Sequence, residues 1–79
     1  MMPLYGFLQG DTLGLLILAS EEESVRSLAE KLQTSAGVRV APRAHVKVLL
    51  GGRVLEPGAT LTDAGLTALD RFDVVAEEP

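Results

Sequence analysis

The sequence predicts an α+β domain in which one helix packs across one face of a mixed five-stranded sheet. Apolar residues recur at spacings of three and four between residues 25 and 36, which is typical of an amphipathic helix. The other apolar segments are short runs bounded by Gly, Pro or Asp, which is typical of strands. Their order is two strands, one helix and three strands, so the repeated crossover helices of a doubly wound fold are missing.

A hairpin is predicted at the start of the chain. Residues 4–9 form its first strand, Gly10-Asp11 its turn and residues 12–19 its second strand. The second apolar run is too short for a typical helix and ends at an acidic cluster, so we interpret it as a strand.

The helix is predicted to begin after Ser24, whose hydroxyl can accept a hydrogen bond from a free amide of the first turn. Ser20 is the alternative N-cap. It would form a capping box with Glu23 and start the helix one turn earlier. Gly37 is expected to adopt a left-handed conformation that terminates the helix near Ala36.

The second half of the chain is predicted to hold three strands. Residues 46–50 and 53–55 form a second hairpin around the tight turn Gly51-Gly52, and residues 62–64 can form one short helical turn at most. Alternating apolar and polar residues predict a final strand at residues 72–77. Two hairpins with one helix between them predict a β-grasp, in which the first and last strands can pair in parallel at the centre of the sheet.

Composition restricts the possible functions. The chain has 79 residues, is predicted to be a single domain over residues 1–79, and has no cysteine, which excludes a disulfide framework and a thiolate metal site. Its net charge of −4 disfavours binding to nucleic acid. The apolar run at residues 13–19 is far shorter than the roughly 20 residues that span a bilayer, and no basic residue precedes it as in a secretory signal. We therefore expect a cytoplasmic protein that does not contact membranes.

Residues for catalysis or metal binding are scarce. His45 is the only histidine, so neither a zinc site nor a carboxylate-bridged diiron site can be built. No nucleophile elbow and no phosphate-binding glycine motif occurs. Glu21-Glu22-Glu23 could be read as calcium ligands, but a solvated helix start is the favoured interpretation, because the run lacks the spaced Asp, Asn and Gly of a loop site. We expect no catalytic residue, no cofactor and no metal in this chain.

The second predicted strand is unusual because residues 15–18 are all apolar, although a sheet covered by one helix buries only one face. If Leu15 and Ile17 point to the helix, their neighbours point outward and form a candidate docking surface with other leucines and valines. The expected members of this surface are Leu4, Leu8, Leu16, Leu18, Leu49 and Val75. The alternative is a few scattered exposed leucines, which are ordinary in soluble proteins.

Two arginines, Arg39 and Arg43, are further docking candidates. They flank Val40-Ala41-Pro42 in the connector that follows the helix. Their guanidinium groups could pair with carboxylates of a partner protein, or they could be solvated loop side chains. The residue types favour neither interpretation.

Residues 47–63 resemble ubiquitin, with a strand, a glycine-containing turn, and then Leu, an acidic residue, Gly, Thr-Leu and a polar-Asp pair. The resemblance implies the ubiquitin-like form of the β-grasp. The end of the sequence, Ala76-Glu77-Glu78-Pro79, has no terminal Gly-Gly, so a conjugated modifier is not expected.

A closer resemblance covers the sequence nearly end to end. Residues 24–31, 39–43, 64–66 and 72–78 are similar to the small ubiquitin-like subunit, protein B or γ, of the toluene-4-monooxygenase group of soluble diiron monooxygenases. The connector Arg-Val-Ala-Pro-Arg is the most specific segment, because no β-grasp geometry requires it.

This resemblance implies a non-catalytic subunit of a hydroxylase assembled from two copies each of three subunits. The hydroxylase α and β subunits are the implied partners, and the α subunit is implied to hold the diiron centre. The implied assembly hydroxylates or epoxidises aromatic or alkene hydrocarbons. The alternative function is a free-standing ubiquitin-like adaptor that binds proteins without being conjugated to them.

Overall fold

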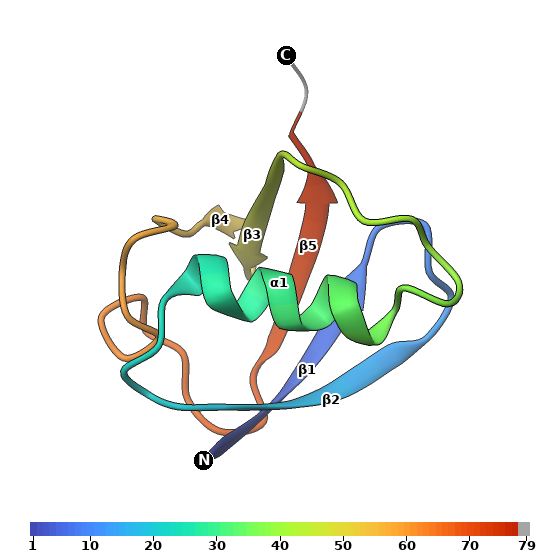
Figure 1. The fold of residues 1–79 in the computed structure, drawn as a ribbon. Coiled ribbons are helices and arrows are strands. Elements are labelled where there is room, and N and C mark those ends of the chain that lie inside the picture. The colour runs from blue at the N-terminus through green and yellow to red at the C-terminus, as the bar shows by residue number, and fades with distance from the viewer. Residues whose placement is uncertain (78–79) are drawn as a thin grey trace.

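The computed structural model describes residues 1–77 and consists of one five-stranded mixed sheet with a single helix packed across one face (Figure 1). The strand order is β2-β1-β5-β3-β4, with β1 and β5 parallel at the centre and the other neighbours antiparallel. The elements are β1 (Met2–Leu8), β2 (Gly14–Ala19), α1 (Val25–Ser35), β3 (Val46–Leu50), β4 (Arg53–Val54) and β5 (Arg71–Ala76). The predicted fold class and the parallel central pair are confirmed.

The loop of the first hairpin is longer than the predicted two-residue turn. Phe7 pairs with Gly14, so residues 9–13 form the loop, and the Asp11 carboxylate accepts a hydrogen bond from the Leu13 amide at 3.3 Å. Gly10 has a φ of +94°, a conformation that L side chains rarely adopt. The second strand therefore begins at residue 14 instead of residue 12.

The N-terminus of α1 follows the favoured prediction. Ser24 is the N-cap, and its Oγ accepts from the Ser27 amide at 3.0 Å. The alternative pair makes one half of a capping box, since the Ser20 amide donates to Glu23 Oε1 at 2.8 Å, but the helix does not begin there.

The C-terminus of α1 differs from the prediction. The helix ends at Ser35 with Ala36 as its C-cap, close to the expected end, but Gly37 is not among the residues with positive φ, so its predicted left-handed conformation is wrong. The Ala36 carbonyl accepts from the amides of Arg39 and Val40 at 2.9 and 3.0 Å. These right-handed turns supply amide donors to a free carbonyl at the end of the helix, so no left-handed residue is needed.

The core lies between α1 and the inner face of the sheet. Buried residues of the helix at the predicted spacing pack against buried strand and loop residues, and the largest are Phe72, Leu4, Leu28, Leu32, Leu61, Val25 and Val74. Gly6 lets the side chains of Phe72 and Leu32 pack closely against β1, because a Cβ at this position would lie 2.6 Å from Phe72 Cζ and 2.9 Å from Leu32 Cδ1.

The loop after β4 is tied to the start of the helix. Ser24 and Thr60 form an isolated β-bridge, and the Val25 amide donates to the Ala59 carbonyl at 2.9 Å. Residues 62–64 form a turn and not a helix. Leu61 and Leu66 from this loop are buried and belong to the core.

Candidate functional site

The outer face of the sheet, opposite α1, carries the candidate docking surface. Leu16 and Leu18 of β2 lie there, with exposed fractions of 57% and 53%. Their outward direction agrees with the expectation from the sequence.

Leu4 and Leu8 do not lie on the outer face. Their exposed fractions are 0% and 5%, and both belong to the core, so their predicted outward placement is wrong. The register explains the error. Leu4 pairs with Ile17, and residues directly opposite each other in an antiparallel pair point to the same face. A shift of one residue would have reversed every side chain of β1.

The outward positions of β1 are the odd-numbered residues, which the sequence interpretation missed. Tyr5 pairs with Leu16 and Pro3 with Leu18, and Tyr5 has an exposed fraction of 43%. The signal was present in the sequence, because the odd-numbered residues of β1 are themselves apolar. We call the group Pro3, Tyr5, Phe7, Leu16 and Leu18 the outer apolar patch.

Phe7 has a defined position at one end of the outer apolar patch. A Cβ on its cross-strand partner Gly14 would lie 2.5 Å from Phe7 Cζ, so the ring covers this glycine. The guanidinium carbon of Arg71 lies 4.0 Å from the centre of the Phe7 ring, a cation–π arrangement. Arg71 Nη2 also donates to Asp73 Oδ1 at 3.1 Å.

Arg71 and Asp73 divide the outer face into two parts. Leu49 pairs with Asp73, and Val75 pairs with Lys47, so both apolar side chains have the expected outward parity but lie beyond the charged pair on β5. They are partly buried. The single continuous patch expected from the sequence is therefore interrupted by two charged side chains.

Arg39 is held within the chain. Its Nε donates to Asp11 Oδ1 at 3.0 Å and its Nη2 to Oδ2 at 2.9 Å, so both prongs of the guanidinium face one carboxylate. The Asp11 side chain is only 2% exposed. The hydrogen bonds from Arg39 lower the pKa of Asp11, and the same contact raises the pKa of Arg39. This pair joins the loop of the first hairpin to the connector after α1.

Arg43 is fixed mainly through its backbone. The buried Gln33 side chain accepts from the Arg43 amide at 2.7 Å and donates to the Arg43 carbonyl at 3.1 Å. Arg43 Nη1 donates to Gln9 Oε1 at 3.2 Å, and the same oxygen accepts from the Ala76 amide. Gln33 was not singled out from the sequence, where it stands on the helix among charged and polar residues.

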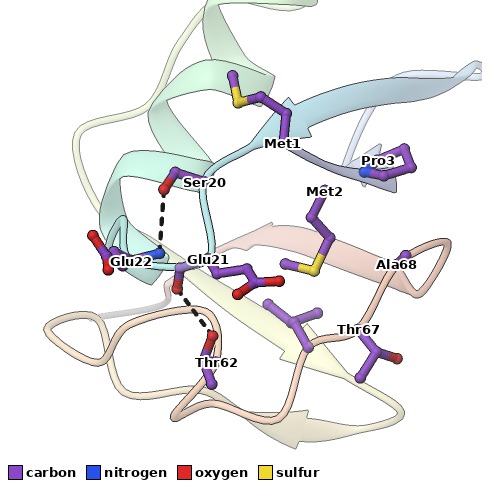
Figure 2. Close-up of a pocket in the computed structure, with 10 residues that line it drawn as sticks. Met1, Met2, Pro3, Ser20, Glu21, Glu22, Thr62, Thr67 and Ala68 are labelled. Carbon is purple, nitrogen blue, oxygen red and sulfur yellow. Dashed lines mark hydrogen bonds between the residues drawn. The ribbon is translucent and has the colours of Figure 1, made fainter.

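The acidic run before α1 lines an open depression of about 660 Å³ at the start of β1 (Figure 2). In it the Glu22 amide donates to Ser20 Oγ at 3.3 Å, and Thr62 Oγ1 donates to the Glu21 carbonyl at 3.2 Å. The depression is lined largely by apolar and backbone groups. Among residues 1–77, no group of three or more His, Cys, Asp or Glu side chains could hold a metal ion.

Glu23 has structural contacts of its own. Its carboxylate accepts from Lys31 Nζ at 2.8 Å, from Ser27 Oγ at 2.8 Å and from the Ser20 amide. Burial raises the pKa of Glu23, but these hydrogen bonds outweigh it and leave the pKa below its ordinary value. Lys31 also donates to the Leu18 carbonyl at 3.1 Å, so the pair ties the helix to β2.

His45 lies at the mouth of a groove between α1 and β3, where its carbonyl accepts from the Glu77 amide at 3.0 Å. Its side chain is exposed. In the part of the chain that the structure describes, none of the helices has the length and apolar character needed to cross a membrane.

Comparisons with known proteins agree over nearly the whole chain. A family model described as toluene-4-monooxygenase system protein B (TmoB) matches residues 1–75. A chain in the solved structure of a toluene 4 monooxygenase HD complex with the inhibitor 4-bromobenzoate is 26% identical, with a TM-score of 0.88 over 96% of this chain and 98% of that chain. Ubiquitin from Caldiarchaeum subterraneum is 18% identical, with a TM-score of 0.79 over 99% of this chain and 95% of that chain, and shares the fold. No curated protein sequence matches the chain.

Proposed function

We propose, from the premise that this chain belongs to the toluene-4-monooxygenase system protein B family, that it is the small subunit of a multicomponent monooxygenase hydroxylase. The observation that carries the proposal is the end-to-end match to a chain of a toluene 4 monooxygenase HD complex, which leaves almost no part of either chain uncovered. The partners are the hydroxylase α and β subunits. Under this proposal, the assembly hydroxylates or epoxidises aromatic or alkene hydrocarbons.

The chain's own role is to bind the other subunits and not to carry out chemistry. The described residues offer one histidine, and that side chain is exposed and has no carboxylate partner within salt-bridge distance in residues 1–77. The polar pairs of the molecule tie its own elements together, as Arg39 does with Asp11. The diiron centre belongs, in this proposal, to the α subunit.

The outer apolar patch is the proposed docking surface. It has a rigid base, because its side chains stand on neighbouring strands whose inner faces form the core. Full burial of a leucine side chain stabilises an interface by about 1.5–3 kcal/mol, so Leu16 and Leu18 can contribute substantially. Tyr5 and Phe7 add aromatic area, which is enriched at the centres of protein interfaces.

A free-standing ubiquitin-like adaptor is the less supported alternative. The likeness to Caldiarchaeum subterraneum ubiquitin concerns the fold alone, whereas the family model is specific to a monooxygenase component.

The proposal is tested by co-expressing this chain with a tagged hydroxylase α subunit and the β subunit. The unmodified chain is expected to co-purify in a stable three-subunit complex. Leu16→Glu places a charge at the centre of the outer apolar patch, and we expect it to remain folded but to be lost from the complex. Val38→Glu is the matched control, because Val38 is 90% exposed in the turns after α1 and is not part of the patch.

Two results would contradict the proposal at different levels. If the unmodified chain does not co-purify with the hydroxylase subunits, it is not their partner. If Leu16→Glu co-purifies as well as Val38→Glu, the chain is a subunit but docks through another surface.

A further inference from the structure

The turn before β5 holds a leucine in an unusual backbone conformation. Leu69 has a φ of +70° and is the only non-glycine residue among residues 1–77 with a positive φ. The Asp70 amide donates to the Thr67 carbonyl at 3.1 Å, so residues 67–70 form a β-turn with Leu69 at the third position. A left-handed φ at this position normally selects Gly or Asn, because the Cβ of other residues crowds the following carbonyl oxygen.

This turn is fixed from both sides. The Leu69 amide donates to the Pro3 carbonyl of β1 at 2.6 Å, and the Tyr5 amide donates to the Asp70 carbonyl at 2.9 Å. Within the turn, the Asp70 carboxylate accepts from the amide and the hydroxyl of Thr67 at 2.9 and 3.1 Å. These hydrogen bonds hold Leu69 in its left-handed conformation, and none of them involves the leucine side chain.

The Leu69 side chain does not stabilise the core. It is 61% exposed, and within residues 1–77 it belongs neither to the buried core nor to the apolar residues packed against the core. Glycine or asparagine would form the same turn with less strain, and the same hydrogen bonds would remain. A single exposed leucine is ordinary, but this one adds backbone strain to the domain and no core contact.

Leu69 adjoins the outer apolar patch. Its hydrogen-bond partner Pro3 is a member of that patch, and Tyr5, another member, is bonded to the residue that follows Leu69. Pro3 also pairs with Leu18 across the first hairpin. The turn therefore lies at the Pro3 and Leu18 end of the patch, whereas Phe7 lies at the other end. A partner that covers this end of the patch also meets the turn.

We propose that Leu69 is an anchor residue of the docking surface and inserts its side chain into an apolar hollow of the hydroxylase subunit that covers the outer apolar patch. This inference rests on the proposed function, because it takes that subunit as the partner. The hollow is apolar, because a polar group facing the leucine would lose its water without gaining a hydrogen bond. The turn holds the leucine backbone in one conformation before binding, so little backbone entropy is lost when the complex forms.

Leu69→Asn and Leu69→Gly test the anchor, because both remove the apolar side chain and both suit a left-handed φ. Each variant replaces the unmodified chain in co-expression with the β subunit and a tagged α subunit, and its recovery per α subunit is measured. We expect recovery to fall at least about threefold for both variants, because apolar area buried in the complex is lost. The isolated Leu69→Asn variant should melt at or above the temperature of the unmodified chain, because backbone strain is relieved.

Two matched variants separate the role of the side chain from the act of substitution. Leu69→Met keeps an apolar side chain of similar volume, so it should be recovered as well as the unmodified chain. Val38→Asn makes a similar change at an apolar residue that is 90% exposed, lies outside the patch and has no positive φ. It should leave recovery unchanged and should not raise the melting temperature.

The inference is overturned if Leu69→Asn and Leu69→Gly are recovered as well as Val38→Asn, or if Leu69→Met is lost to the same extent as they are. A melting temperature of Leu69→Asn below that of the unmodified chain also overturns it, because the leucine would then stabilise the fold itself. These results contradict the role of Leu69 alone when the unmodified chain still co-purifies. Failure of the unmodified chain to co-purify contradicts the proposed function and this inference together.

Discussion

At the scale of single residues, Asp11 and Arg39 show how one ion pair positions two segments far apart in the sequence. They are 28 residues apart, and both prongs of the arginine meet one nearly buried carboxylate. The pair anchors the connector that carries the most family-specific segment, Arg-Val-Ala-Pro-Arg. Arg39 therefore acts on the shape of that segment, and the Arg43 side chain is also held within the chain, by its hydrogen bond to Gln9 Oε1.

Asp11 predicts a specific pH dependence of stability. Its pKa is lowered in the folded state, so its contribution to stability is complete above the ordinary value of 3.8 and is lost as the pH falls through the lowered value. Asp11→Asn should be less stable than the unmodified chain at pH 7, and the difference in melting temperature should shrink as the pH falls below about 4. Thermal melts of the variant and the unmodified chain from pH 7 to pH 2 measure this difference in melting temperature.

Arg39→Ala provides the cross-check, because it breaks the same pair from the other side. Its difference from the unmodified chain should shrink over the same pH range. A difference that stays constant down to pH 2 for both variants would show that the ion pair does not contribute to stability.

At the scale of elements, the start of α1 depends on a choice between two serines. Ser24 Oγ caps the Ser27 amide, whereas Ser20 contributes to the acidic segment that leads into the helix. The Glu23 carboxylate connects the two, because it accepts from the Ser20 amide and from Ser27 Oγ. The segment before the helix is thus ordered by the same group that pairs with Lys31.

Ser24→Ala should lower the free energy of unfolding by about 0.5–2 kcal/mol, because it leaves an amide of the first turn without its acceptor. Urea titration of the isolated chain gives this value. Ser35→Ala is the control at the other end of α1, where an exposed side chain should change stability by no more than about 0.5 kcal/mol. If Ser20→Ala destabilises more than Ser24→Ala does, the helix start has been assigned to the wrong serine.

At the scale of the whole molecule, one sheet separates two different surfaces. The inner face and α1 form the core, and the groove between α1 and β3 lies at the edge of that layer. The outer face carries the outer apolar patch, and Arg71 and Asp73 mark its boundary toward β3. A partner can therefore occupy either surface without unfolding the domain.

The two faces predict opposite results for two leucines of the first hairpin. Leu4→Ala should reduce the free energy of unfolding by about 2–5 kcal/mol, because it opens a cavity in the core. Leu16→Ala should change it by no more than about 0.5 kcal/mol, because the side chain is exposed in the isolated chain. Urea unfolding of both variants under the same conditions is the measurement, and equal losses would contradict the register of β1 against β2.

Local patterns in the sequence were sufficient to predict the order of the elements, the helix and its N-cap, the third strand and the family. Each depends on residues close together in the chain, such as the apolar spacing of α1, the serine before it, and the Gly51-Gly52 turn, where both glycines have positive φ. The outward direction of Leu16 and Leu18 also followed from the unbroken apolar run of β2.

The tertiary structure alone decided which face of the sheet holds Leu4 and Leu8 and what the connector arginines contact. The five-residue loop at residues 9–13 sets the register of β1 against β2, and a shift of one residue exchanges the two faces of a strand whose positions are nearly all apolar. The contacts of Arg39 with Asp11 and of Arg43 with Gln9 join residues far apart in sequence. No local pattern encodes such contacts, because they exist only once the helix has packed across the sheet.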